Sequence, residues 1–223
     1  MNTQGGRLVY NSALETLRRN GVNPGRAVLS QSYLRLEAPL STSQTGYTFD
    51  ILVNEGINPN YVTQSKLALQ DVFLASSIGV FMYIPHSASV AEPAGRLYSY
   101  PDPATTAFGA TTSVDSYGIY NGYLSYTVNQ RTILTAWDLN RHLDVPITQT
   151  NTTPTGTGAT GATNSINFAN GGFYAVEPNL YISGSKKNLL TITLPSALAT
   201  ITTNSRLVVI MRGLLAQNIT SVR

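Results

Sequence analysis

The segment RLVVIMRG, Arg206–Gly213, is the clearest indication of fold in this sequence. Its residues Leu207–Met211 form an unbroken apolar run, which is typical of a strand that is buried on both faces. Three stretches upstream also predict strands: GGFYAV at 171–176, NLYISG at 179–184 and KNLLTITLP at 187–195. A turn is predicted between two of them at Ser183–Lys187, where Ser, Gly and Lys gather. The last quarter of the chain therefore predicts consecutive β-strands.

Strands are also predicted upstream. Over Tyr33–Glu37, Leu34 and Leu36 alternate with Arg35 and Glu37, which predicts one apolar and one polar face. Further candidates are TGYTFDILVN at 45–54, IGVFMYIP at 78–85, GRLYSYP at 95–101, YGIYNGYLSYTVNQ at 117–130 and RTILTAWDL at 131–139. The last two predict a hairpin that turns at Asn129–Gln130. Many strands with Gly, Pro and Asn between them predict an all-β sandwich or barrel.

Only two short helices are expected. One lies near the start, where Asn11 or Ser12 would cap it and Gly21 followed by Pro24 would end it. The other is Ser65–Ala75, in which Leu67, Val72 and Leu74 are spaced more like a helix than a strand.

The composition favours a chain that is covered by partners. Of the 223 residues, only 11% are charged, against about 25% in ordinary soluble domains. So few charges leave a weakly repelling surface, which favours contact with copies or partners over a neutral monomer. There is no Cys, which suits a reducing cytoplasm. No secretion signal and no membrane span are expected, because the longest apolar run, Val72–Ile84, is shorter than the ~20 residues that a span needs.

The excess positive charge lies in residues 1–26. Four arginines, Arg7, Arg18, Arg19 and Arg26, stand there against Glu15, and the remaining residues have ten basic and ten acidic side chains. A basic arm on a neutral body favours a phosphate-rich neighbour, either nucleic acid or lipid headgroups. Local charge pairing along a helix is the alternative.

The stretch QTNTTPTGTGATGATNSINFANGG, 149–172, contains no charge, Leu or Val. It cannot form a core, and its glycines disfavour a helix. Because strands are predicted on both sides of it, we expect a long exposed loop at one end of a β-barrel.

No residue set predicts catalysis. Asp138, His142 and Asp144 could gather around a metal, but a strand end followed by a polar turn explains them better. Structural calcium could bind scattered carboxylates, namely Asp50, Glu55, Asp71 and Asp115, although no calcium-loop motif is present. No other cofactor is expected, and we expect the protein not to be an enzyme.

Six tyrosines could form a stacking face for sugars or bases, although packing across strands explains such a pattern more often. They are Tyr98, Tyr100, Tyr117, Tyr120, Tyr123 and Tyr126.

Two short echoes suggest an internal duplication. Tyr33-Leu34 is repeated as Tyr123-Leu124, and Phe49-Asp50 resembles Trp137-Asp138 at a similar offset. With these echoes, its length and its C-terminal strands, the chain resembles the double jelly-roll major capsid proteins of tailless, membrane-containing icosahedral phages of the corticovirus and Finnlakevirus kind. The likeness is one of architecture and depends on no diagnostic motif.

The resemblance implies two side-by-side jelly rolls. The basic arm and helix would occupy residues 1–26, the first roll 27–114 and the second roll 115–223, with the loop 149–172 on the outer face. Three chains would form a pseudo-hexagonal capsomer of an icosahedral shell, in contact with neighbouring capsomers and with minor proteins such as pentons and spikes. The four arginines would face an internal lipid membrane or the packaged genome. The chain would be located in the virion after assembly in the host cytoplasm.

Three alternatives stay open. Only about a dozen strands can be defended, and 223 residues is short for two rolls, so a single elaborated jelly roll is an alternative fold. A receptor-binding spike or fibre protein, or a carbohydrate-binding β-sandwich, is an alternative function.

Overall fold

The structure is a computed structural model that describes residues 3–85, 96–99, 118–143, 147–150, 163–166, 171–199, 201 and 203–217. One long helix, α1 (Thr3–Arg19), precedes the strands. The strands are β1 (Val28–Pro39), β2 (Gly46–Phe49), β3 (Val72–Ile84), β4 (Arg96–Tyr98), β5 (Tyr123–Val128), β6 (Arg131–Asp138), β7 (Ile147–Thr150), β8 (Thr163–Ile166), β9 (Phe173–Ser183), β10 (Asn188–Thr193) and β11 (Arg206–Gln217). A short 3-10 helix, η2 (Leu139–His142), follows β6. The described residues are therefore mostly β.

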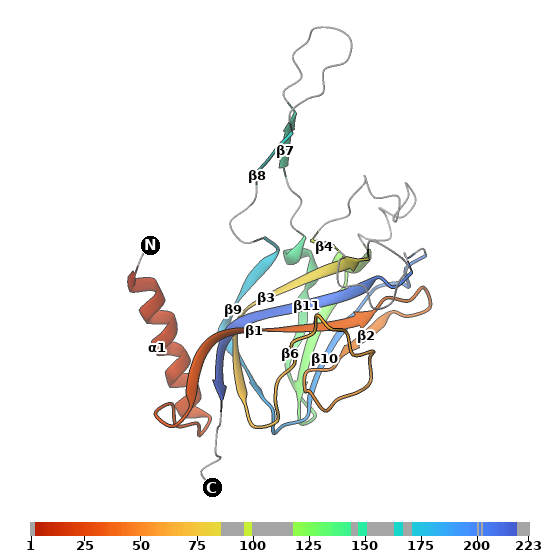
Figure 1. The fold of residues 1–223 in the computed structure, drawn as a ribbon. Helices are drawn as coiled ribbons and strands as arrows, with labels where there is room; N and C mark the ends of the chain where they lie inside the picture. Colours follow the sequence, from red (N-terminus) through yellow and green to blue (C-terminus); the bar gives the residue numbers. More distant parts are fainter. Residues whose placement is uncertain are drawn as a thin grey trace.

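Two antiparallel sheets face each other in a sandwich (Figure 1). The five-stranded sheet has the order β1-β11-β3-β4, and β9 pairs with β3 on the same side as β4. The four-stranded sheet has the order β2-β10-β5-β6. The inner faces of both sheets contribute to one apolar core, in which Leu36, Phe49, Tyr126 and Met211 are fully or almost fully buried.

Each sheet contains strands from both ends of the chain. β1 pairs with β11 from Val28↔Gln217 to Pro39↔Arg206, and β2 pairs with β10. Consecutive strands of the sandwich lie in opposite sheets, except for the β5–β6 hairpin and for β4, which lies beside β3. The described strands therefore build one sandwich around one core.

The expected double jelly roll is not confirmed. Both sheets contain strands from the ranges 27–114 and 115–223, so the described strands do not separate into two rolls. The expected boundary after residue 114 lies outside the described residues. The sequence echo has no counterpart in the sheets either, because Tyr33 lies in β1 of the five-stranded sheet and Tyr123 in β5 of the four-stranded sheet.

Several local predictions are confirmed. Leu207, Val209 and Met211 face the inner core, while Val208 is buried on the opposite face of β11, so this strand is covered on both sides. The β5–β6 hairpin turns at Asn129 and Gln130, whose φ angles of 46° and 68° suit a two-residue type I′ turn.

The helix predictions are only partly right. α1 does end before Gly21, which takes a φ of 79°, but it begins at Thr3 rather than at Asn11 or Ser12. The helix expected at Ser65–Ala75 is wrong, because β3 begins at Val72. Alternate side chains of β3 contact α1 and the inner core, so both faces of the strand are buried. A strand that is buried on both faces does not show the alternation of apolar and polar residues from which a strand is predicted.

The expected long loop at 149–172 is described only in part. β7 and β8 form a two-stranded ribbon that belongs to neither large sheet, with Thr150 opposite Thr163. Figure 1 shows this ribbon beyond one end of the sandwich. Residues 151–162 and 167–170 lie outside the described residues.

Candidate functional site

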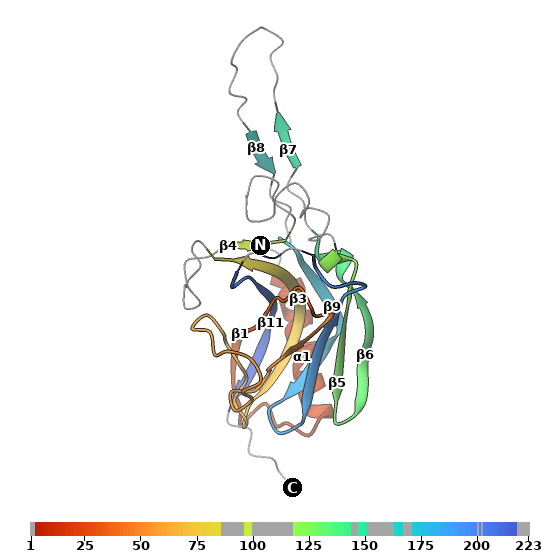
Figure 2. The same ribbon diagram turned by 90° about the vertical axis from the view of Figure 1, so that its right-hand side faces the viewer.

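The outer face of the five-stranded sheet is covered at one end by α1. Ala13 and Leu17 of the helix form a buried cluster with Val72, Leu74 and Ala216 of the sheet. Figure 1 shows α1 beside the curved ends of β1 and β11, away from β6 and β10, and in Figure 2 the helix lies behind the strands. The amphipathic helix predicted at the start of the chain therefore packs on the body of the same chain.

The other end of this face is covered by residues 61–64 of the β2–β3 connection. There the Glu37 side chain is fully buried and accepts three hydrogen bonds: from Arg35 Nε at 2.7 Å, from Arg206 Nη1 at 2.9 Å and from Thr63 Oγ1 at 2.5 Å. Gln64 Nε2 also donates to the Glu37 main-chain oxygen at 3.1 Å. The predicted alternation is confirmed, since Arg35 and Glu37 share the face opposite Leu34, but the connection buries Glu37.

Two guanidinium groups share the single carboxylate of Glu37, which leaves this cluster with one net positive charge. The Arg206 guanidinium also lies between two tyrosine rings, 3.8 Å from the Tyr61 centroid and 4.5 Å from the Tyr83 centroid. Burial raises the pKa of the Tyr61 hydroxyl, and the nearby positive charge of Arg206 partly offsets that rise. Cation–π contacts and the ion pair together hold Arg206 in place.

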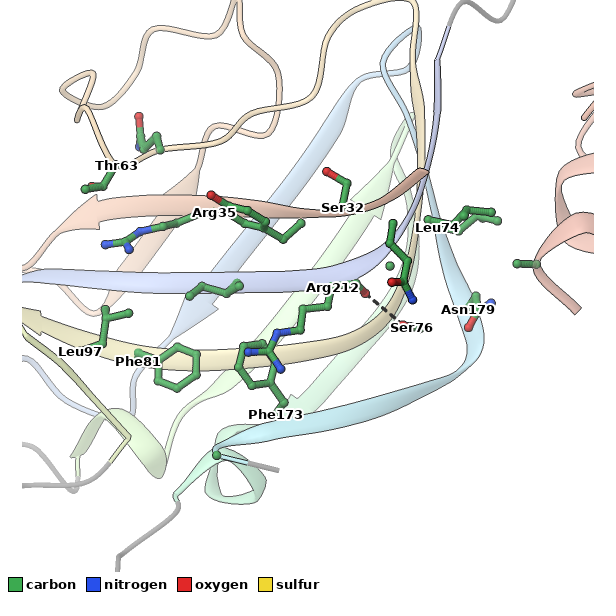
Figure 3. Close-up of a pocket in the computed structure, with 18 of the residues that line it drawn as sticks. Ser32, Arg35, Thr63, Leu74, Ser76, Phe81, Leu97, Phe173, Asn179 and Arg212 are labelled. Atoms are coloured by element: carbon green, nitrogen blue, oxygen red, sulfur yellow. Dashed lines mark hydrogen bonds between the residues drawn. The ribbon is translucent and has the colours of Figure 1, made fainter. Parts of the chain in front are cut away.

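A groove of about 1040 Å³ lies between these two covers (Figure 3). It is lined by Tyr10 of α1, Tyr33 and Arg35 of β1, Arg212 of β11, and Phe81 and Phe173 of β3 and β9, among others. In the sheet register Tyr33 is opposite Arg212, and Arg35 is opposite Ile210, so these side chains occupy neighbouring rows of one face. The groove thus combines aromatic rings with arginines.

Arg212 packs against a wall of the groove that is formed by the rings of Phe173 and Phe81. Its guanidinium carbon lies 3.5 Å from the centroid of the Phe173 ring, and the Phe173 and Phe81 rings are 5.3 Å apart. Gly79 makes room for this wall, because a Cβ atom there would lie 2.6 Å from the Phe81 ring. No carboxylate of the described residues lies within ion-pair distance of Arg212.

The arginines predicted to face a phosphate-rich partner lie at or near α1. Arg18 and Arg19 occupy its last turn and are exposed, as is Arg26 in the following turn. Arg19 Nη2 pairs with Glu15 Oε1 at 2.5 Å, which agrees with the alternative of local charge pairing along the helix. The backbone of Arg7 lies in α1, but its side chain is outside the described part of the chain. The groove arginines were missed, because only the β1–β11 register brings them together.

The candidate metal cluster at 138–144 is engaged in local packing. Trp137 Nε1 donates to His142 Nε2 at 2.8 Å, so His142 Nδ1 carries the proton and donates to the Gly172 oxygen at 3.0 Å. Burial lowers the pKa of His142 to about 4, which favours its neutral form. Asp138 Oδ1 accepts from the Asn140 amide at the start of η2, and Asp144 lies outside the described residues.

The candidate calcium carboxylates do not converge. Asp50 Oδ2 accepts from the Asn58 amide at 2.9 Å and lies 3.5 Å from Lys66 Nζ, while Glu55 Oε2 accepts two main-chain amides. Asp71 is at the start of β3, and Asp115 falls outside the described residues. Across the described ranges, no group of three or more His, Cys, Asp or Glu side chains could hold a metal ion.

The described members of the tyrosine set do not form a surface. Tyr98, Tyr120 and Tyr126 are buried in the core, and among the described members only Tyr123 is well exposed. Tyr100 and Tyr117 lie outside the described residues. Burial raises the pKa of both Tyr120 and Tyr126, as expected for core hydroxyls.

Within the part of the chain that the structure describes, no helix is both long enough and apolar enough to cross a membrane. Comparison with known proteins gives no match to a family model, to a curated protein or to a solved structure.

Proposed function

We propose that this chain is the shell-forming capsid protein of a virus, built on a single jelly roll. The observation that carries the proposal is the strand order, β1-β11-β3-β9 in one sheet and β2-β10-β5-β6 in the other. Apart from the three-residue strand β4, these are two four-stranded antiparallel sheets in which early and late strands of the chain are neighbours. This order supports a jelly roll, a fold used by viral capsid proteins, lectins and cupins. Because this fold serves several functions, the choice among them depends on the side chains of the surface and of the interior.

The interior favours a structural role over a cupin-like or lectin-like one. Apolar side chains from both sheets fill the space between them, and His142 is used in packing rather than aimed into a cavity. Three of the four described tyrosines that would have formed a carbohydrate platform are core residues. A receptor-binding spike stays a second candidate, since it too would be a β-rich assembled protein.

The surface favours contacts with other copies. Large apolar side chains are exposed on several connections and strands, with Val62 at 88%, Ile57 at 73% and Ile133 at 52%. Only 11% of the residues are charged, so little repulsion opposes association. Neighbouring copies that cover these side chains would stabilise the assembled state.

Copies would join through side chains and connections rather than by adding strands. The β6 edge is irregular, with two register shifts against β5, and β9 contains Pro178, which has no amide hydrogen to donate. β2 has only four residues, and β1 is bridged to Ser65 at Arg35. Interrupted edges of this kind oppose uncontrolled sheet extension.

In this role the chain would be located in the virion after assembly in the host cytoplasm. Its partners would be other copies of the chain and minor capsid proteins. A pseudo-hexagonal trimer needs two rolls in each chain, so a single roll changes how many chains form a capsomer. Expression of the full chain followed by negative-stain microscopy tests the proposal. Closed shells are expected, whereas a soluble trimer that forms no shells would favour the spike.

A further inference from the structure

We infer that the groove on the outer face of the five-stranded sheet is a binding site for single-stranded nucleic acid. The inference deepens the proposed function and rests on it only for the source of the ligand, which would be a packaged genome. The binding itself is a property of the groove and can be measured on unassembled protein.

The charge of this face suits a polyanion. The Glu37 cluster has two guanidinium groups for one buried carboxylate, and Arg212 has no carboxylate within ion-pair distance among the described residues. Arg35 and Arg212 both line the groove, and Glu15 of the neighbouring helix α1 is already paired with Arg19. Positive charge is therefore concentrated along one path across the face, which is the electrostatic pattern that follows a phosphate backbone.

The aromatic residues of the groove suit unpaired bases. Tyr33 is 53% exposed on β1, and Tyr10 is 46% exposed on the α1 wall, so both rings are open to a ligand. The Arg212 guanidinium carbon lies 3.5 Å from the Phe173 ring centroid, and the residue is exposed, so a ligand can reach it. Bases stack on exposed aromatic rings and on guanidinium planes, and this interaction tolerates any base sequence.

The same chemistry disfavours a duplex. In a double helix the bases are stacked on each other, so their faces cannot reach Tyr33 or Arg212. An acidic peptide or an anionic membrane would use the charges of the groove but not its exposed rings. Compared with a duplex, an acidic peptide or an anionic membrane, single-stranded DNA or RNA is the ligand that uses both features.

The test measures fluorescence anisotropy of a short fluorescein-labelled oligothymidylate with the purified full chain, kept unassembled at low concentration. Tyr33→Ala should weaken binding about tenfold, in line with the loss of one base stack, while Tyr33→Phe keeps the ring and should bind like the wild type. Arg212→Gln should weaken binding and lower the slope of log affinity against log salt by about 0.7. Tyr123→Ala and Arg131→Gln, exposed on the four-stranded sheet, are the matched controls and should change neither quantity.

Thermal unfolding establishes that each variant is folded. The inference is overturned if the oligonucleotide does not bind, if the control variants weaken binding as much as the groove variants do, or if Tyr33→Phe loses as much affinity as Tyr33→Ala. It is also overturned if duplex DNA, polyglutamate or phosphatidylglycerol vesicles compete as well as the single strand. Shell formation is assayed separately: shells without groove binding contradict this inference alone, and groove binding without shells contradicts the proposed function alone.

Discussion

Glu37 of β1 and Arg206 of β11 form a buried ion pair of 2.9 Å, although 169 residues separate them in the sequence. Their contact joins the first and last strands of the sandwich, and Thr63, which donates to the same Glu37 carboxylate, lines the groove. The pair connects the fold to the candidate site, because the same β1–β11 register places Tyr33 opposite Arg212.

Glu37→Ala should lower the free energy of unfolding by about 3–5 kcal/mol, because Arg35 and Arg206 would lose their shared buried carboxylate. Urea unfolding measures the change. Glu15→Ala is the matched control: it removes an exposed ion pair on α1 and should cost below about 1 kcal/mol. Equal effects of the two substitutions would show that the buried cluster does not stabilise the fold.

His142 should make stability depend on pH. Its pKa is about 4 when folded and about 6.5 when unfolded, so between these values the unfolded chain binds a proton that the folded chain does not. The free energy of unfolding therefore falls as the pH falls, by about 1.4 kcal/mol per pH unit from this group, and the loss is complete near pH 4.

The measurement compares a His86→Asn protein, in which His142 is the sole histidine, with the same protein carrying His142→Phe. The stability advantage of His142 over Phe should shrink as the pH falls from about 6.5 to about 4. Arg141 and Asp138 are the charged neighbours, and they act on the pKa of His142 in opposite directions. A constant difference across this range would contradict a buried neutral imidazole.

Gly213→Ala should destabilise the five-stranded sheet. A Cβ atom at this position would lie 1.8 Å from the Leu74 oxygen, at the register shift between β11 and β3. Overpacking of this kind costs about 1–3 kcal/mol, and more where backbone must move. Gly46→Ala in β2 is the control, because a Cβ atom there would have nothing within 4 Å of it. Chemical denaturation that finds both proteins equally stable would refute the close approach of the two strands.

Removal of residues 1–26 should leave the sandwich folded but less stable. Without α1, the buried side chains of Val72, Leu74 and Ala216 become exposed to water. Circular dichroism should show retained β-structure with a lower urea midpoint, and microscopy should show fewer shells than the full chain gives. An unchanged midpoint and an unchanged shell yield would together show that α1 neither covers the sheet nor assists assembly.

Local features of the fold could be predicted from the sequence, because neighbouring residues determine them. The apolar run Leu207–Met211, the alternation at Leu34 and Leu36, and the turn at Asn129–Gln130 are all of this kind. The order of the strands could not be predicted, since pairs such as β1–β11 join the two ends of the chain. The echo of two residue pairs, which suggests a duplication, has no counterpart among the described strands.

The basic segment near α1 could be predicted from the sequence, but the groove and its arginines could not. The basic residues near α1 stand out because Arg18, Arg19 and Arg26 follow each other along the chain. The groove depends on Tyr33, Arg212 and Phe173, which come from three different strands and meet only through the sheet register. Glu37 gave no sign of burial, because the cover comes from Thr63 in a connection without regular structure.

The most direct test of the shell-forming role is sedimentation velocity of the purified full chain across a series of salt and protein concentrations, with negative-stain microscopy of each fraction. A capsid subunit should convert cooperatively from small species to closed shells of uniform size. A species that stays monomeric at every concentration and salt condition would contradict the role, since its exposed apolar side chains would then need no neighbour to cover them.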